Sequence, residues 1–199
     1  MAKNFQKTLS KQGIKFKLGT KVTSSHVNDD GVKLTMEPSQ GGETEEFDAD
    51  VVLVATGRRP FTSGLGLEEL GVKMDSIGRV EVDHNFATSV PSIFAIGDAI
   101  PGPMLAHKAE EEGVACVEKI AGHAGHINYD CIPDVIYTHP EIAAVGKTEE
   151  QLKEAGIKYN KGTFPFMANS RARTVQDADG MVKILADKET DRVLGIHIM

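Results

Sequence analysis

The residues best suited to chemistry lie in the segment IFAIGDAIPGPMLAHKAEEEG, which spans residues 93–113. Its apolar start is typical of a buried strand, and this strand would end at Gly97 and Asp98. Ligands of open α/β sheets bind at the carboxyl edge of the strands, where an ionised Asp accepts hydrogen bonds through two oxygens. The glycine beside it permits a close backbone approach. Asp98 is therefore a candidate ligand for the hydroxyl groups of a sugar or a ribitol chain.

A helix is predicted to begin a few residues later, near Met104 or Leu105, and to run to Gly122. The first turn of a helix offers free N–H groups and a partial positive charge. A polyol next to a ring that becomes anionic would suit both features, and a flavin is such a cofactor. The alternative is that Asp98 only caps the following loop and binds no ligand.

The elements that must position these residues follow from the hydrophobic pattern of the first half of the chain. Two runs, residues 51–55 and 92–98, are apolar and predict strands that are buried on both faces. The other predicted elements of this half are a helix at residues 2–11, strands at 14–18 and 32–37, a short helix at 65–72, and a strand and turn after residue 78.

From residue 129 onward the pattern changes to short alternating runs that predict an antiparallel sheet. A helix is predicted after Thr148, which is a plausible N-cap because Glu149 and Glu150 follow it in the first turn. The sequence DKETDR between the last two alternating runs predicts a hairpin loop.

Composition excludes several classes of function. The formal net charge of -7 argues against a nucleic-acid surface and against binding to an anionic membrane. No apolar run approaches the roughly 20 residues of a membrane span, and no secretory signal is visible. Residues 1–22 carry six lysines and no acid, which indicates either the polar face of a surface helix and strand or a transit peptide. Cys116 and Cys131 have no metal-ligand spacing, so a reducing compartment and inert thiols are expected.

A series of motifs along almost the whole chain resembles the pyridine nucleotide-disulfide oxidoreductase family, and within it the lipoamide branch. TGRRP and AIGD alone indicate the broad family, whereas MLAHKAEEEG followed by YTHPE and FPFMANSRA is specific to the branch. The remaining matching motifs are KNFQ, KQGIKFKL, LGLEELGV, VGKTEEQLKEAGI and DRVLGIHI.

The resemblance implies a mixed α/β fold in three parts. These are the tail of a Rossmann-like NAD domain (residues 1–57), a central FAD-contacting domain (58–128), and most of an antiparallel-sheet interface domain for dimerisation (129–199). By similarity, Asp98 holds the ribitol chain of FAD. The other implied cofactor contacts are Met104, Leu105, Ala106 and His107 for the flavin, and Val22 and Gly57 for NAD.

The activity implied for the complete protein is oxidation of protein-bound dihydrolipoyl groups, with electrons passing through a redox disulfide and FAD to NAD⁺. The implied partners are a second copy of the chain and the lipoyl domains and core of 2-oxo acid dehydrogenase complexes. The implied compartment is the mitochondrial matrix in a eukaryote or the cytoplasm in a bacterium.

The abrupt first helix and last strand lead us to expect a piece of a longer polypeptide. No Gly-rich phosphate loop occurs in this sequence. The redox disulfide and the catalytic His-Glu pair of the family would also lie outside it, so the chain alone is expected to be inactive. Two rival functions remain open: a non-catalytic dimerisation scaffold, and a related flavin reductase with another substrate such as glutathione.

Four further features each have two interpretations. His107 and Glu112 have the family's His-Glu spacing, but positions five apart on a helix point about 140° apart, so they are not expected to pair. His139 in YTHPE resembles a catalytic residue but is expected to be a turn and packing residue. Arg58 and Arg59 either face a pyrophosphate or form a solvated rim. The segment NSRAR, residues 169–173, belongs either to a dimer contact or to a surface loop.

Overall fold

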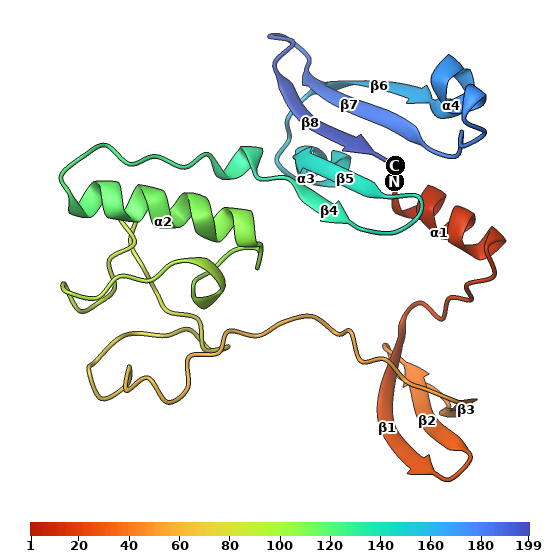
Figure 1. Cartoon of the computed structure of the whole chain (residues 1–199), viewed down its shortest axis with the longest axis horizontal. Helices are drawn as coiled ribbons and strands as arrows, with labels where there is room; N and C mark the ends of the chain where they lie inside the picture. Colours follow the sequence, from red (N-terminus) through yellow and green to blue (C-terminus); the bar gives the residue numbers. More distant parts are fainter. The chain divides into compact units, whose positions relative to one another are not determined.

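The structure is a computed structural model that describes all 199 residues, and it contains two compact units, Met1–Thr56 and Gly57–Met199. Each unit is described by itself (Figure 1). The fold is mixed α/β with antiparallel sheets, which confirms the predicted class. None of its helices combines the length and the apolar character needed to cross a bilayer.

The first unit holds one helix and a small sheet. Helix α1 covers Ala2–Lys11, as predicted. Strands β1 (Thr20–Asn28), β2 (Gly31–Pro38) and β3 (Glu45–Ala49) form an antiparallel sheet in the order β1-β2-β3. The pairing of Asn28 with Gly31 leaves a two-residue turn between β1 and β2. Strand β2 confirms the strand predicted at residues 32–37.

The second unit begins with loops that pack on one long helix, α2, which covers Ala106–Ile120 and confirms the predicted helix. A short 3₁₀ turn, η1 (Gly97–Ala99), precedes it. In Figure 1 the loops before α2 lie along the helix. The buried side chains of this core are Val72, Val80, Phe86, Ile100, Ala115 and Cys116.

A five-stranded sheet with the order β4-β5-β8-β7-β6 forms the rest of the second unit, and all its neighbouring strands are antiparallel. The predicted hairpin DKETDR joins β7 to β8. The strands of this sheet are β4 (Asp134–Ile136), β5 (Ile142–Gly146), β6 (Tyr159–Pro165), β7 (Met181–Asp187) and β8 (Val193–Ile198). The short helical elements of this part of the chain are η2 (Tyr129–Cys131), α3 (Glu149–Glu154), η3 (Phe166–Ala168) and α4 (Ser170–Thr174).

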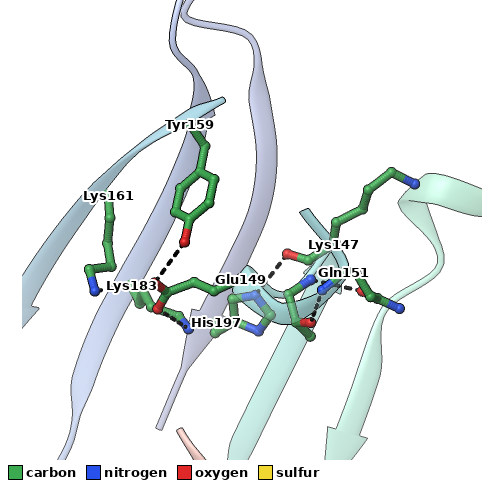
Figure 2. Close-up of polar contacts among 8 residues, drawn as sticks. Lys147, Glu149, Gln151, Tyr159, Lys161, Lys183 and His197 are labelled. Atoms are coloured by element: carbon green, nitrogen blue, oxygen red, sulfur yellow. Dashed lines mark hydrogen bonds and ion pairs between the residues drawn. The ribbon is translucent and has the colours of Figure 1, made fainter. Parts of the chain in front are cut away.

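Helix α3 is fixed to the sheet through Glu149 (Figure 2). Lys183 on β7 donates to one carboxylate oxygen of Glu149 at 3.1 Å, and Lys161 and Tyr159 on β6 each donate to the other oxygen at 3.2 Å. The helix start is closed by a capping box in which Thr148 and Gln151 bond each other's backbone N–H, so the predicted N-cap is confirmed.

Burial on its own would raise the pKa of Glu149, but the hydrogen bonds from Lys183 and Lys161 outweigh it. The net effect lowers that pKa from its usual 4.5 to about 2. The ionised carboxylate therefore stabilises the fold.

The two faces of the sheet differ in what covers them. Lys183, Leu185 and His197 are buried on the side that carries Glu149 of α3. The alternate positions of β7 and β8 point to the other side, and there Ile184 is 41% exposed. We call this the open sheet face, and it consists of Val182, Ile184, Ile196 and Ile198.

Three segments predicted as strands are not strands. Residues 14–18 and 51–55 form no ladder, and Leu53 is 88% exposed although a fully buried strand was predicted there. Residues 92–98 contribute a single bridge, Ala87 with Phe94, before the η1 turn. An apolar β-branched run becomes a strand only when neighbouring strands supply hydrogen bonds, and no strand of this chain pairs with these runs. The helix predicted at residues 65–72 is a series of turns that ends at Gly71.

We expect the variant Glu149→Gln to remove a pH-dependent part of the stability. Because the folded pKa lies below the usual 4.5, this contribution is complete above pH 4.5 and is lost as the pH falls towards 2. The difference in unfolding free energy between wild type and Glu149→Gln should shrink by about 1 kcal/mol between pH 7 and pH 3.5, as measured by urea titration. The control is Glu154→Gln, which makes the same change at the exposed end of the same helix, outside the Glu149 network. A constant difference for Glu149→Gln would contradict this role.

Candidate functional site

Asp98 lies in the middle of the η1 turn, where its carboxylate is 41% exposed. Arg58 Nη2 donates to its Oδ2 at 3.0 Å. The Arg58 guanidinium is thus paired with a carboxylate, a contact that neither interpretation of Arg58 predicted. A carboxylate has about four acceptor positions, so Asp98 keeps capacity for hydroxyl donors beside Arg58.

The backbone of the turn depends on Gly97, which has a φ of +68°. A Cβ at this position would lie 2.9 Å from the Cβ of Ala109 on α2. The positive φ and the close approach both favour glycine, so η1 packs directly on the helix surface.

A fully buried ion pair on α2 holds both polar groups of this glycine. Glu112 Oε2 accepts from Gly97 N–H at 2.7 Å, and Lys108 Nζ donates to the Gly97 carbonyl at 3.2 Å. The two side chains also pair with each other, with Lys108 Nζ 3.0 Å from Glu112 Oε1. Neither side chain has any exposed surface.

Two residues of α2 also contact the segment that leads to the sheet. Tyr129 donates its hydroxyl to Glu112 Oε1 at 2.9 Å, and His107 Nε2 lies 2.8 Å from the Pro133 carbonyl, to which it donates. Burial and then the Glu112 hydrogen bond raise the pKa of Tyr129 to about 12, so its hydroxyl stays protonated at neutral pH. His107 and Glu112 have different partners, which confirms that they do not form a pair.

Helix α2 starts where the sequence predicts it, next to Leu105. Leu105 is the N-cap with an extended backbone, and it makes no side-chain capping hydrogen bond. The predicted contacts Met104, Leu105 and His107 are partly buried, and Ala106 is exposed. The N–H groups of the first turn therefore have no side-chain acceptor.

An open groove of about 910 Å³ lies beside this region, and Gly57, Arg58, Arg59 and Met104 line it. Gly57 has a φ of +102° and open space around it. Val22, the other residue predicted to lie near NAD, is in the first unit at a β-bulge of β1 and is exposed. The groove thus contains the two arginines and one of the two predicted NAD residues.

The remaining candidates have local roles. His139 lies in the turn between β4 and β5, which confirms the predicted turn position. Its side chain is 79% exposed rather than packed in the core, with Nε2 3.9 Å from Asp177 Oδ2. Residues 169–173 are not a plain loop, because α4 occupies most of them and Asn169 caps its start. Both cysteines are free, and burial raises the pKa of Cys116.

The contacts of Lys108, Glu112 and Tyr129 were not predicted from the sequence. The only signal for the first two is a Lys-Glu pair four residues apart, which on most helices is an exposed surface pair. Nothing in the spacing of Tyr129 from α2 indicates its contact with Glu112.

Known families match nearly the whole chain. Residues 1–113 match the family model described as pyridine nucleotide-disulphide oxidoreductase. Residues 132–199 match the model for the dimerisation domain of that family.

Individual proteins show the same similarity. The mitochondrial dihydrolipoyl dehydrogenase of Pisum sativum is 61% identical over 99% of this chain, and that of Homo sapiens is 60% identical over all of it. The chain spans 39% of the length of each. Among solved structures, LpdA from Mycobacterium tuberculosis superposes with a TM-score of 0.85 at 27% identity, over 98% of this chain and 41% of LpdA.

The packing of η1 on α2 predicts that Gly97→Ala is more destabilising than a matched glycine change. Gly71 has a similar φ of +79° but open space around it, so Gly71→Ala carries the backbone cost alone. We expect Gly97→Ala to lower the unfolding free energy by about 1–2 kcal/mol more than Gly71→Ala, because of the contact with Ala109. Chemical denaturation measures both values, and equal losses would show that the contact is unimportant.

Proposed function

Because the chain belongs to the pyridine nucleotide-disulphide oxidoreductase family, we propose that it forms part of an FAD- and NAD-dependent dihydrolipoyl dehydrogenase. Identity of 60% or more over at least 99% of the chain to dihydrolipoyl dehydrogenases is the observation that carries this proposal. The reaction is oxidation of protein-bound dihydrolipoyl groups with reduction of NAD⁺.

The residues of the η1–α2 region fit FAD. Asp98 has acceptor capacity beyond its pair with Arg58, and the first turn of α2 has no side-chain cap. The carboxylate suits the ribitol hydroxyls, and the helix start suits a ring edge that gains negative charge. FAD, when bound, carries electrons between the dithiol and NAD⁺. The FAD contacts we propose are Asp98, Met104, Leu105, Ala106 and His107.

These residues would bind the cofactors and orient them. Asp98 would fix the polyol, and the backbone N–H groups of α2 would stabilise charge on the pyrimidine edge. Val22 and Gly57 would lie near NAD, and Arg59 in the groove beside Gly57 is available for a phosphate. We assign residues 1–57 to the NAD domain, 58–128 to the central domain, and 129–199 to the interface domain.

We further propose a homodimer formed through the interface domain. The match of residues 132–199 to a dimerisation domain supports it. The exposed Ile184 and Ile198 of the open sheet face supply apolar surface of the kind that interfaces cover.

The lipoyl domains and core of 2-oxo acid dehydrogenase complexes are the proposed further partners. We propose the mitochondrial matrix as the compartment, which the mitochondrial names of the plant and human relatives support.

The proposed function is tested by sequencing the reading frame that encodes the chain and by assaying the protein that this frame encodes. We expect an upstream pair of cysteines with four residues between them and a downstream His five residues before a Glu. The encoded protein should be yellow and should oxidise dihydrolipoamide with NAD⁺. A colourless protein would favour the scaffold function, and a yellow protein that oxidises other thiols only would favour a related flavin reductase.

Replacing Asp98 by Asn should weaken FAD binding by about 10- to 100-fold, because a hydrogen bond to a charged group contributes about 1.5–3 kcal/mol. Flavin fluorescence titration of the apoprotein measures the change. Asp134→Asn, an exposed change at the start of β4, is the control and should bind as wild type. Equal affinity of the Asp98 and Asp134 variants would remove Asp98 from the site.

Replacing Ile184 by Lys should dissociate the homodimer, since it puts a charge on the open sheet face. Sedimentation equilibrium should give twice the mass of one chain for wild type and the mass of one chain for Ile184→Lys. Val114→Lys, at an exposed apolar position of α2, is the matched control and should remain dimeric. A dimeric Ile184→Lys protein would place the interface elsewhere.

A further inference from the structure

The pair Lys108–Glu112 satisfies every polar atom that it buries. Glu112 accepts from Gly97 N–H, from Lys108 and from Tyr129, and Lys108 donates to Glu112 and to the Gly97 carbonyl. No buried side-chain nitrogen or oxygen lacks a hydrogen-bond partner. A fully satisfied network of this kind allows one arrangement of its members.

Stability alone is a weak reason for such a pair. Removing two charges from water costs as much as their attraction returns, and apolar residues of similar volume often stabilise a protein equally well. What apolar residues cannot supply is a donor and an acceptor for the backbone of one glycine. The pair supplies both to Gly97, the residue directly before Asp98.

The same lysine also fixes the other end of the loop between η1 and α2. Gly102, with a φ of +124°, packs on the Lys108 stem so closely that a Cβ would lie 2.8 Å from Cε. The loop from Gly97 to Gly102 is thus held against α2 at both ends. The position of the Asp98 carboxylate relative to the start of α2 follows from these contacts.

We propose that Lys108 and Glu112 are positioning residues for the flavin, which set the distance and direction between the Asp98 carboxylate and the N-terminus of α2. This inference rests on the proposed function. Neither side chain touches the cofactor, because both are closed off from solvent beneath the turn. Tyr129 fixes the orientation of Glu112 by occupying Oε1.

The test is the double variant Lys108→Met/Glu112→Leu in the full polypeptide that the reading frame encodes. It keeps the buried volume but leaves Gly97 without its partners. The matched control is Glu118→Leu/Lys119→Met, which changes the same residue types on α2 and removes the contacts of Lys119 with His84 and Asn85, away from the turn.

We expect the double variant to keep its helical circular dichroism, to exchange the Gly97 amide hydrogen at least tenfold faster, and to bind FAD at least tenfold more weakly. Its bound flavin should be more fluorescent, and saturating FAD should restore full occupancy, which a loss of folding would not allow. The control should bind FAD as wild type does.

An FAD affinity within twofold of wild type would overturn the positioning role and leave the proposed function intact. A wild-type polypeptide that binds no FAD would overturn the proposed function and this role together. If the double variant does not fold, Glu112→Gln decides: it keeps the size and an acceptor for Gly97 but loses the charge. A three- to tenfold weaker FAD affinity then supports the role, and unchanged affinity overturns it.

Discussion

The site depends on one constraint: both backbone polar groups of a left-handed glycine are bonded by a buried ion pair on the helix beneath it. Gly97 turns the chain so that Asp98 faces outward, and Lys108 and Glu112 hold that turn against α2. The positions of the carboxylate and of the uncapped helix start are therefore set by the fold rather than by a ligand. A binding site that is already arranged loses less conformational entropy when its ligand binds.

The second unit has two carboxylate–lysine networks, one around Glu149 and one around Glu112, and they have different roles. Glu149 is partly exposed, its charge is stabilised by two lysines and a tyrosine, and its effect is to hold α3 on the sheet. Glu112 is fully buried and bonds the backbone, so its effect is geometric. The first network belongs to the region that matches a dimerisation domain, and the second lies under the proposed cofactor site. Tyr129, at the start of the proposed interface domain, also contacts the second network, through its hydroxyl group.

Sequence predicted the elements whose signals are local. The helix α2, the Thr148 cap and the DKETDR hairpin are each predicted from residues within a few positions of one another, and the structure confirms all three. The strand predictions failed for residues 14–18, 51–55 and 92–98, because a strand requires partner strands that a hydrophobic run cannot specify. The sequence also did not indicate the burial of Lys108 and Glu112, since their spacing is the same as that of an exposed pair. The packing of η1 on α2 is what removes the two side chains from solvent. The motifs around Asp98 did predict the family.

The most direct measurement is an experimental structure of the FAD-bound polypeptide that contains this chain. The positioning role predicts Asp98 within hydrogen-bond distance of the ribitol hydroxyls, the first turn of α2 against the pyrimidine edge of the flavin, and Gly97 still bonded to Lys108 and Glu112. A flavin bound far from Asp98, or a turn released from the ion pair when FAD is bound, would contradict it.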